Sequence, residues 1–240
     1  MLGLLHCEAK PMPLPCKPSG GKIGLFEIAR RLACVQRLRA TVPYFCQWES
    51  AHRAGEIIRG ELALADDPAW RNSGARDLDE YVRWASHVCG MACLKMVLAA
   101  RTGHAYATLE LARRSLSYGA YVEEPDGSIR GLIYAPFVQY VAEVFGMRAH
   151  VRVGLPASGL PELMTRADYF IASVHPSIRW PAVQPPKKGG HLVLVTRATP
   201  DAVTFHNPSG EPGSQADVVL PLADFDRFYA GRGVEIPPAG

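Results

Sequence analysis

The chain has 240 residues, of which 48% are apolar and 20% are charged, and its formal net charge is +3. This composition is that of an ordinary globular protein with a sizeable core, and it excludes wholesale disorder. The weak positive charge is scattered along the chain, so we expect no nucleic-acid partner. No run of about 18 apolar residues occurs, so we expect no membrane span.

The first 21 residues are rich in Pro and Gly and predict a disordered tail, followed by a single domain over residues 22–240. They make a poor signal peptide, because Glu8 and Lys10 interrupt a very short apolar run. We therefore expect a cytoplasmic protein. Six cysteines in a long chain of this kind do not favour a disulfide framework.

Apolar residues at helical spacing dominate the first part of the chain, and alternating apolar residues dominate the second. This order predicts an α+β fold with a largely antiparallel sheet. Residues 49–86 are the least regular part and are treated as an insertion. The predicted helices cover 25–40, 77–86, 89–102, 108–116, 131–146, 158–167 and 223–231, and the predicted strands cover 148–153, 169–174, 191–198, 202–208 and 217–222.

The stretch "ASHVCGMACLKMVLAA" places Cys89 in the first turn of a predicted helix, with Cys93 on the same stripe. A helix N-terminus favours thiolate over thiol, and a nucleophilic cysteine needs the thiolate. Gly90 would leave room for a substrate backbone. The alternatives for Cys89 are a small buried apolar residue, or a metal or redox site shared with Cys93.

A nucleophilic thiol also needs a base, and His191 is the candidate because it begins an apolar strand directly after two glycines. If the hairpin turns near residue 199 or 200, Asn207 lies opposite or diagonal to His191. Its side chain would then orient the imidazole, in a Cys-His-Asn arrangement. Asn207 could instead only cap the Asn-Pro-Ser-Gly turn. His206 and His87 are weaker candidates for the base.

These motifs resemble those of papain-like cysteine peptidases that cut bacteriocin leaders after a double glycine, and more closely those of their stand-alone bacterial relatives, the C39-like peptidases. "CGMACLKMVLAARTG" resembles the nucleophile helix, "YFIASVHP" and "GGHLVLVTRA" the strands around the active histidine, and "AVTFHNPSG" the strand that ends in Asp-Pro. "VPYFCQW" resembles an upstream Val-Pro-Tyr-x-x-Gln motif. The resemblance implies a papain-like α+β fold without cofactor or metal, with Cys89 as nucleophile, His191 as base, Asn207 as orienter and Gln47 as oxyanion donor.

Two positions depart from the family pattern. Asn207 stands where the family usually has Asp, and a neutral amide stabilises an imidazolium less than a carboxylate does. Residues 49–86 separate Gln47 from Cys89, whereas the leader peptidases keep the two close together. This segment could form a lid or a surface for a partner.

The hypothesis that follows is a thiol hydrolase that cleaves a peptide or protein substrate through an acyl-enzyme. The same cysteine could pass the acyl group to an amine, as a transpeptidase or acyltransferase does. The fold could also serve as a peptide- or partner-binding module without chemistry. A redox or metal sensor built on Cys89 and Cys93 is a further, weaker alternative.

Overall fold

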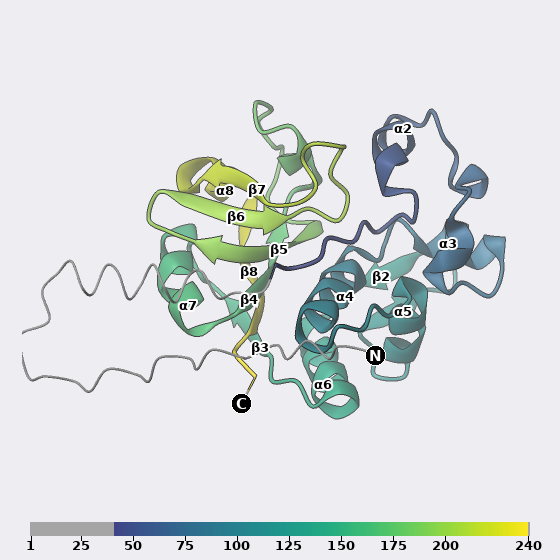
Figure 1. Cartoon of the computed structure of the whole chain (residues 1–240), viewed down its shortest axis with the longest axis horizontal. Coiled ribbons are helices and arrows are strands. Elements are labelled where there is room, and N and C mark those ends of the chain that lie inside the picture. Colours follow the sequence, from purple (N-terminus) through teal and green to yellow (C-terminus); the bar gives the residue numbers. More distant parts are fainter. Residues whose placement is uncertain (1–40, 240) are drawn as a thin grey trace, which may run out of the picture. The chain divides into compact units, whose positions relative to one another are not determined.

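Helices precede a six-stranded antiparallel sheet in this computed structural model, which describes residues 41–239 (Figure 1). The fold is α+β, as the sequence predicts. The predicted tail over residues 1–21 and the predicted helix over 25–40 lie outside the described residues. Within residues 41–239, no helix combines the length and the apolar character needed to cross a membrane.

Among the described helices, capping signals in the sequence mark the start of α3 and the glycine ends of α2, α4 and α6. Asp77 caps α3 by accepting a hydrogen bond from the Glu80 N–H at 2.7 Å, and Gly103 ends α4 in a left-handed conformation. The helices of the described residues are α2 (Ala54–Arg59), α3 (Leu78–Trp84), α4 (Cys89–Thr102), α5 (Thr108–Leu116), α6 (Tyr134–Phe145), α7 (Leu160–Arg166) and α8 (Leu222–Phe228). Short 3-10 turns cover Ala51–Arg53, Leu64–Asp66, Trp70–Ser73, Ala157–Gly159 and Pro176–Arg179.

The strands form a hairpin, β1–β2, and a larger sheet with the order β3-β8-β4-β5-β6-β7. Their bounds are β1 (Tyr121–Glu123), β2 (Ile129–Gly131), β3 (His150–Val153), β4 (Tyr169–Val174), β5 (His191–Ala198), β6 (Ala202–His206), β7 (Val218–Pro221) and β8 (Tyr229–Ile236). The hairpin and β8 were not expected. The predicted helix over 223–231 ends at Phe228, and the chain continues as β8 between β3 and β4.

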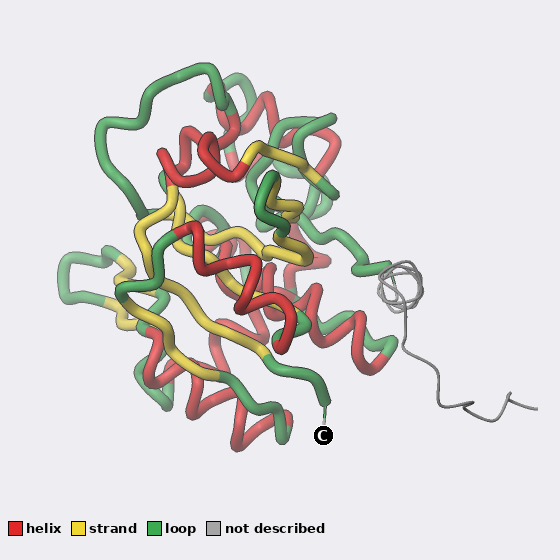
Figure 2. The backbone as a smooth tube through the Cα atoms, turned by 90° about the vertical axis from the view of Figure 1, so that its left-hand side faces the viewer, coloured by secondary structure: helices red, strands yellow, loops and turns green. Residues whose placement is uncertain are grey.

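The sheet is buried on both faces, because alternate side chains of its central strands enter two separate hydrophobic cores. On one face, Ile171 and Leu194 belong to the core that includes α4 and α6. On the other face, Phe170 and Val193 belong to the core that includes α7 and α8. Figure 2, which looks from the left-hand side of Figure 1, shows helix in front of the strands and further helices behind them.

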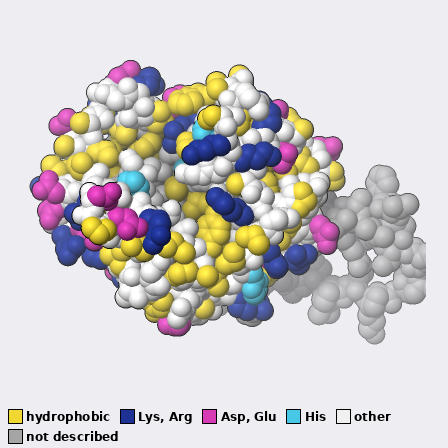
Figure 3. All heavy atoms as spheres, turned by 180° about the vertical axis from the view of Figure 1, so that it is seen from behind, with side chains coloured by type: hydrophobic (Ala, Val, Ile, Leu, Met, Phe, Trp, Pro, Cys, Tyr) yellow, Lys and Arg dark blue, Asp and Glu magenta, His cyan; other side chains and the backbone are white. Residues whose placement is uncertain are grey.

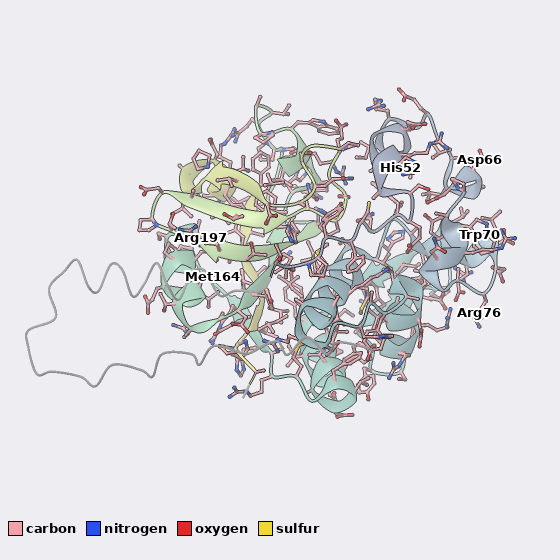
Figure 4. The ribbon with its side chains drawn as sticks, viewed as in Figure 1. His52, Asp66, Trp70, Arg76, Met164 and Arg197 are labelled. Carbon is pink, nitrogen blue, oxygen red and sulfur yellow. The ribbon has the colours of Figure 1, made fainter. Side chains whose placement is uncertain are left out.

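A buried carboxylate holds the segment 49–86 together. Asp67 accepts hydrogen bonds from the Ser50 hydroxyl at 2.5 Å and from the Tyr81 hydroxyl. Burial acts to raise the pKa of Asp67, but these hydrogen bonds outweigh it and lower the pKa. That the segment is an insertion stays a prediction. Figure 4 shows four labelled residues of the segment on its outer side, away from the sheet: His52, Asp66, Trp70 and Arg76.

The N-terminal turn of α4 packs tightly at Gly90. A Cβ at this position would lie 2.9 Å from Leu132 Cδ2 and 3.0 Å from Leu192 Cδ1. The space beside Gly90 is therefore filled by the protein's own side chains, and the expectation that it leaves room for a substrate backbone is wrong. The glycine instead allows α4 to approach β5 closely, which brings Cys89 to the start of that strand.

We predict that Gly90→Ala destabilises the protein by about 1–3 kcal/mol, because the added methyl group overpacks a site bounded by two leucine side chains. Urea unfolding followed by circular dichroism measures this loss. Gly55→Ala is the matched control, since its Cβ would meet only the flexible end of Arg59, and alanine favours helix α2 by about 0.5–1 kcal/mol. Equal unfolding midpoints for the two variants would contradict the prediction.

Candidate active site

A cavity of about 280 Å³ lies beside the N-terminus of α4 and contains both Cys89 and His191 in its wall. Cys89 is the first residue of α4, and His191 is the first residue of β5. Helix α4 packs on β5, so the two chain segments meet at these ends. The other residues of the wall are Gly131, Leu132, Tyr134, Ser173, Gly190, Leu192 and Arg232.

The imidazole of His191 is oriented by the turn that follows β6. Asn207 Oδ1 lies 2.9 Å from His191 Nε2, and the same oxygen accepts a hydrogen bond from the Ser209 backbone N–H at 3.2 Å. The backbone donor assigns the orientation of the amide, whose oxygen can only accept. His191 Nε2 therefore donates its proton to Asn207, and Nδ1 keeps a lone pair that can take a proton.

A positive charge stands next to this arrangement. Arg179 donates hydrogen bonds to the Ser209 hydroxyl at 2.5 Å and to the Ser209 carbonyl at 2.6 Å, and this hydroxyl lies 3.1 Å from His191 Nε2. Burial and then the Arg179 charge lower the pKa of His191 to about 3, against the opposing effect of the Asn207 hydrogen bond. The ring is accordingly neutral at physiological pH.

The thiol of Cys89 is also held in its neutral form. Burial raises the pKa of Cys89, while the backbone N–H groups of Leu192 and Gly90 and the charge of Arg179 lower it to a smaller extent. The helix N-terminus was expected to favour the thiolate, but desolvation outweighs that effect here. At rest the cavity therefore contains a thiol and a neutral imidazole, and no ion pair.

The segment that contains Gln47 is tied to the turn after β6. The Gln47 backbone N–H donates to the Pro208 carbonyl at 2.8 Å, and the Tyr44 hydroxyl donates to the Asn207 carbonyl at 3.0 Å. The motif over residues 42–48 thus lies against the Asn-Pro turn. It is extended, but it does not pair as a strand.

The side chain of Gln47 lies in a second cavity. It is 4% exposed, and its Oε1 is buried without a hydrogen-bond partner. This cavity, of about 440 Å³, also has Arg179 and Ser86 in its wall, together with apolar side chains of residues 48–64. Ser86 stands three positions before Cys89. The structure therefore brings Gln47 near the start of α4, in a different cavity from the one that contains Cys89.

The other candidates from the sequence, His206, His87 and Cys93, lie outside the walls of the Cys89 cavity. His206 is buried, with Nε2 3.0 Å from the Val42 carbonyl and Nδ1 accepting from the Asp217 N–H. His87 is exposed. Cys93 is fully buried, with its sulfur 3.9 Å from the Leu192 carbonyl. Among residues 41–239, no group of three or more His, Cys, Asp or Glu side chains could hold a metal ion.

Several polar residues around the site were not expected from the sequence, among them Arg179, Ser209 and Arg232. Arg179 stands in a loop whose shape the sequence does not reveal, and Arg232 belongs to the unexpected strand β8. Ser209 had one visible signal, because it follows Asn207 and Pro208 in a turn motif in which small hydroxyl residues commonly bond the backbone.

No family model and no curated protein matches this chain. Among solved structures, it is similar to the peptidase domain of Streptococcus ComA, a bifunctional ABC transporter of a quorum-sensing pathway, at 16% identity and a TM-score of 0.45, over 64% of this chain and 93% of that one. A double-glycine-motif protease from an AMS/PCAT transporter, in complex with the leader peptide, shares 21% identity at a TM-score of 0.39, over 62% and 84%.

A protein of Bacillus anthracis described as C39-like peptidase shares 13% identity at a TM-score of 0.45, over 64% of this chain and 90% of that one. All three similar structures are C39-family peptidase domains, the family that the sequence motifs resemble.

We predict that Arg179→Gln raises the pKa of His191, because the imidazolium form no longer faces a neighbouring positive charge. An NMR titration of the histidine ring measures the shift. Arg179→Lys keeps the charge and should leave the pKa of His191 lower than Arg179→Gln does. If both variants raise it equally, the geometry of the hydrogen bonds to Ser209, and not the charge, controls the imidazole.

Proposed function

We propose that this protein is a cysteine peptidase that cleaves a peptide bond of a peptide or protein substrate through an acyl-enzyme. The observation that carries the proposal is the hydrogen bond from His191 Nε2 to Asn207 Oδ1. It leaves His191 Nδ1 as a proton acceptor in the wall of the same cavity as the Cys89 thiol. Cys89 is the nucleophile, His191 the base and Asn207 the residue that orients the base.

In the first half of the reaction, His191 Nδ1 takes the Cys89 proton as the sulfur attacks the substrate carbonyl carbon. The carbonyl π electrons move to oxygen and form a tetrahedral oxyanion. When the oxyanion collapses, the carbon–nitrogen bond breaks, and the leaving amine takes the proton from His191. The products are a free amine and a thioester on Cys89, and the imidazole is neutral again.

In the second half, His191 Nδ1 takes a proton from water, whose oxygen attacks the thioester carbon. Collapse of the second oxyanion releases the carboxylic acid and returns the proton to the Cys89 sulfur. A neutral resting pair suits this cycle, because the imidazole has its lone pair available at the outset. The imidazolium forms only when oxyanion charge appears beside it.

The oxyanion needs hydrogen-bond donors. We assign this role to the Cys89 backbone N–H, at the start of α4, and to the Gln47 side chain. The support for Gln47 is that its segment is bonded to Pro208, next to the orienting residue, and that Ser86 of the same cavity wall stands just before Cys89. Its buried Oε1 has no hydrogen-bond partner, and on this assignment the amide turns toward Cys89 when a substrate carbonyl is bound.

A binding module without catalysis is the second candidate, and one observation favours it. Burial raises the pKa of Cys89 and lowers that of His191, so neither group is charged at rest. A thiol in this state has to be activated by the substrate complex itself. On the binding hypothesis, the protein retains a peptide in the cavity and never forms the thioester.

We predict that His191→Ala lowers kcat/KM for peptide cleavage by about 10²–10⁴-fold, the usual contribution of a positioned acid–base group. The substrates are a mixture of internally quenched octapeptides, and intact-protein mass spectrometry detects the thioester on Cys89. Cys89→Ala should abolish both signals. His104→Ala is the control, because His104 is exposed and lies beyond the other end of α4.

The three hypotheses give different results in this experiment. Cleavage that requires Cys89 and yields free acids supports the peptidase. If added glycinamide appears covalently joined to the new carboxyl end, the acyl-enzyme prefers an amine, and the transpeptidase alternative replaces hydrolysis. If wild-type protein and Cys89→Ala retain the same peptides and neither forms a thioester nor cleaves them, the protein is a binding module.

A further inference from the structure

The wall of the cavity that faces Cys89 and His191 carries three hydrogen-bond donors from three different elements. Ser173 lies near the end of β4, Arg232 lies on β8, and Tyr134 begins α6. None of them has a part in the acyl-transfer steps described above. Together they form a polar surface directly beside the thiol.

Two of these donors lie close together beside Gly189. A Cβ on Gly189 would lie 3.2 Å from both Ser173 Oγ and Ala230 Cβ and 3.4 Å from Arg232 Nη2, so Ser173 and Arg232 are both within contact distance of one point. Tyr134 belongs to the same group: burial raises the pKa of its hydroxyl, while a hydrogen bond with Ser173 and the charge of Arg232 lower it. The three donors therefore converge.

The cavity has no negative charge to balance Arg232. No Asp or Glu is among the described residues of its wall. Within residues 41–239, no carboxylate lies within 4 Å of the Arg232 guanidinium, whereas Arg152 on the adjacent strand pairs with Glu235 at 2.5 Å. On the face drawn in Figure 3, Lys and Arg side chains lie near the middle and Asp and Glu side chains mainly toward the edge.

We propose that this cavity binds a carboxylate of the substrate next to the scissile bond, and that Arg232 determines this specificity. A guanidinium presents two parallel N–H groups to a carboxylate, and one hydroxyl of the hydrogen-bonded Ser173–Tyr134 pair can donate to a remaining lone pair. The carboxylate belongs either to an acidic side chain or to the free C-terminus of a short peptide. The proposal rests on the peptidase function proposed above and defines its substrate class.

The first test compares two reagents that alkylate Cys89 and needs no peptide substrate. Iodoacetate carries a carboxylate and iodoacetamide does not, so the ratio of their rates at Cys89 reports the attraction of the cavity for an anion. Mass spectrometry of peptides locates the label. We expect Arg232→Gln to lower the iodoacetate-to-iodoacetamide ratio by about fivefold, and Arg232→Glu to lower it further.

The second test uses peptides that wild-type protein cleaves. Each is made in matched versions with Glu, Gln or Lys at every position near the cleaved bond, and with a free or an amidated C-terminus. We expect one acidic position, or the free C-terminus, to raise kcat/KM by about tenfold. This preference should disappear in Arg232→Gln and should turn toward Lys in Arg232→Glu.

Arg197→Gln is the matched control, since Arg197 is also exposed and stands on β5, six residues and roughly 20 Å along the strand from His191. Figure 4 shows Arg197 toward the left-hand end of the sheet, away from α4. This variant should keep the wild-type rate ratio and the wild-type preference. Arg232→Lys, which keeps the charge, should retain part of both.

The outcomes separate the two proposals. If Arg232→Gln and Arg197→Gln give the same rate ratio as wild type, the carboxylate site is wrong. It is also wrong if Glu and Gln peptides are cleaved equally and the C-terminus has no effect. In both cases, cleavage of peptides by wild-type protein still supports the peptidase. If the rate ratio falls only in the Arg232 variants and no peptide is cleaved, the carboxylate site stands and the peptidase function fails.

Discussion

The turn from Asn207 to Gly210 is the constraint on which the rest of the site depends. Its backbone is held by the Gln215 carbonyl, which accepts from the Asn207 N–H at 2.7 Å, and by the donors of Tyr44 and Gln47. Because the turn is fixed from several sides, the Asn207 amide has one orientation. That orientation determines which nitrogen of His191 carries the proton, and hence whether the imidazole can accept one from a thiol.

The same turn explains why an amide can stand where the resembling family usually has a carboxylate. A carboxylate at position 207 would lie near the Arg179 guanidinium, and the two charges would cancel in a buried place at a large desolvation cost. The neutral amide leaves Arg179 as the charged group beside the imidazole. In the reaction proposed above, charge separation in the site occurs only when a substrate oxyanion forms, so the buried thiol and imidazole need no compensating charge while the site is empty.

Much of this arrangement could be predicted from the sequence, because the segments concerned have strong local signals. The short apolar runs of β4 and β5 predicted these strands with their observed bounds, and the position of the hairpin turn placed Asn207 near His191. Strand β8 could not be found in this way. The alternation of apolar and polar residues is hidden in β8 by two glycines, Gly231 and Gly233, and by charged residues. The helical pattern of α8 also continues into the first residues of β8.

What the sequence could not supply were the contacts made by residues without a local signal. Arg179 and Arg232 are ordinary charged residues in their own segments, and only the fold brings Arg232 to the cavity of Cys89 and Arg179 to the cavity of Gln47. The sequence also could not predict whether the pKa of Cys89 is raised or lowered. A helix N-terminus is visible in a sequence, but the burial that outweighs it is a property of the packed molecule.

The position of β8 also determines when the sheet can form during synthesis of the chain. It is the last strand along the chain, yet it lies between β3 and β4 and pairs with both. Until β8 has been synthesised, one edge of β4 has unpaired backbone N–H and C=O groups. Such an edge can pair with a strand of another chain. A nascent chain that already contains Cys89 and His191 therefore still lacks the strand that completes the sheet. Completion of the sheet therefore depends on the eight residues of β8, whose own sequence looks the least like a strand.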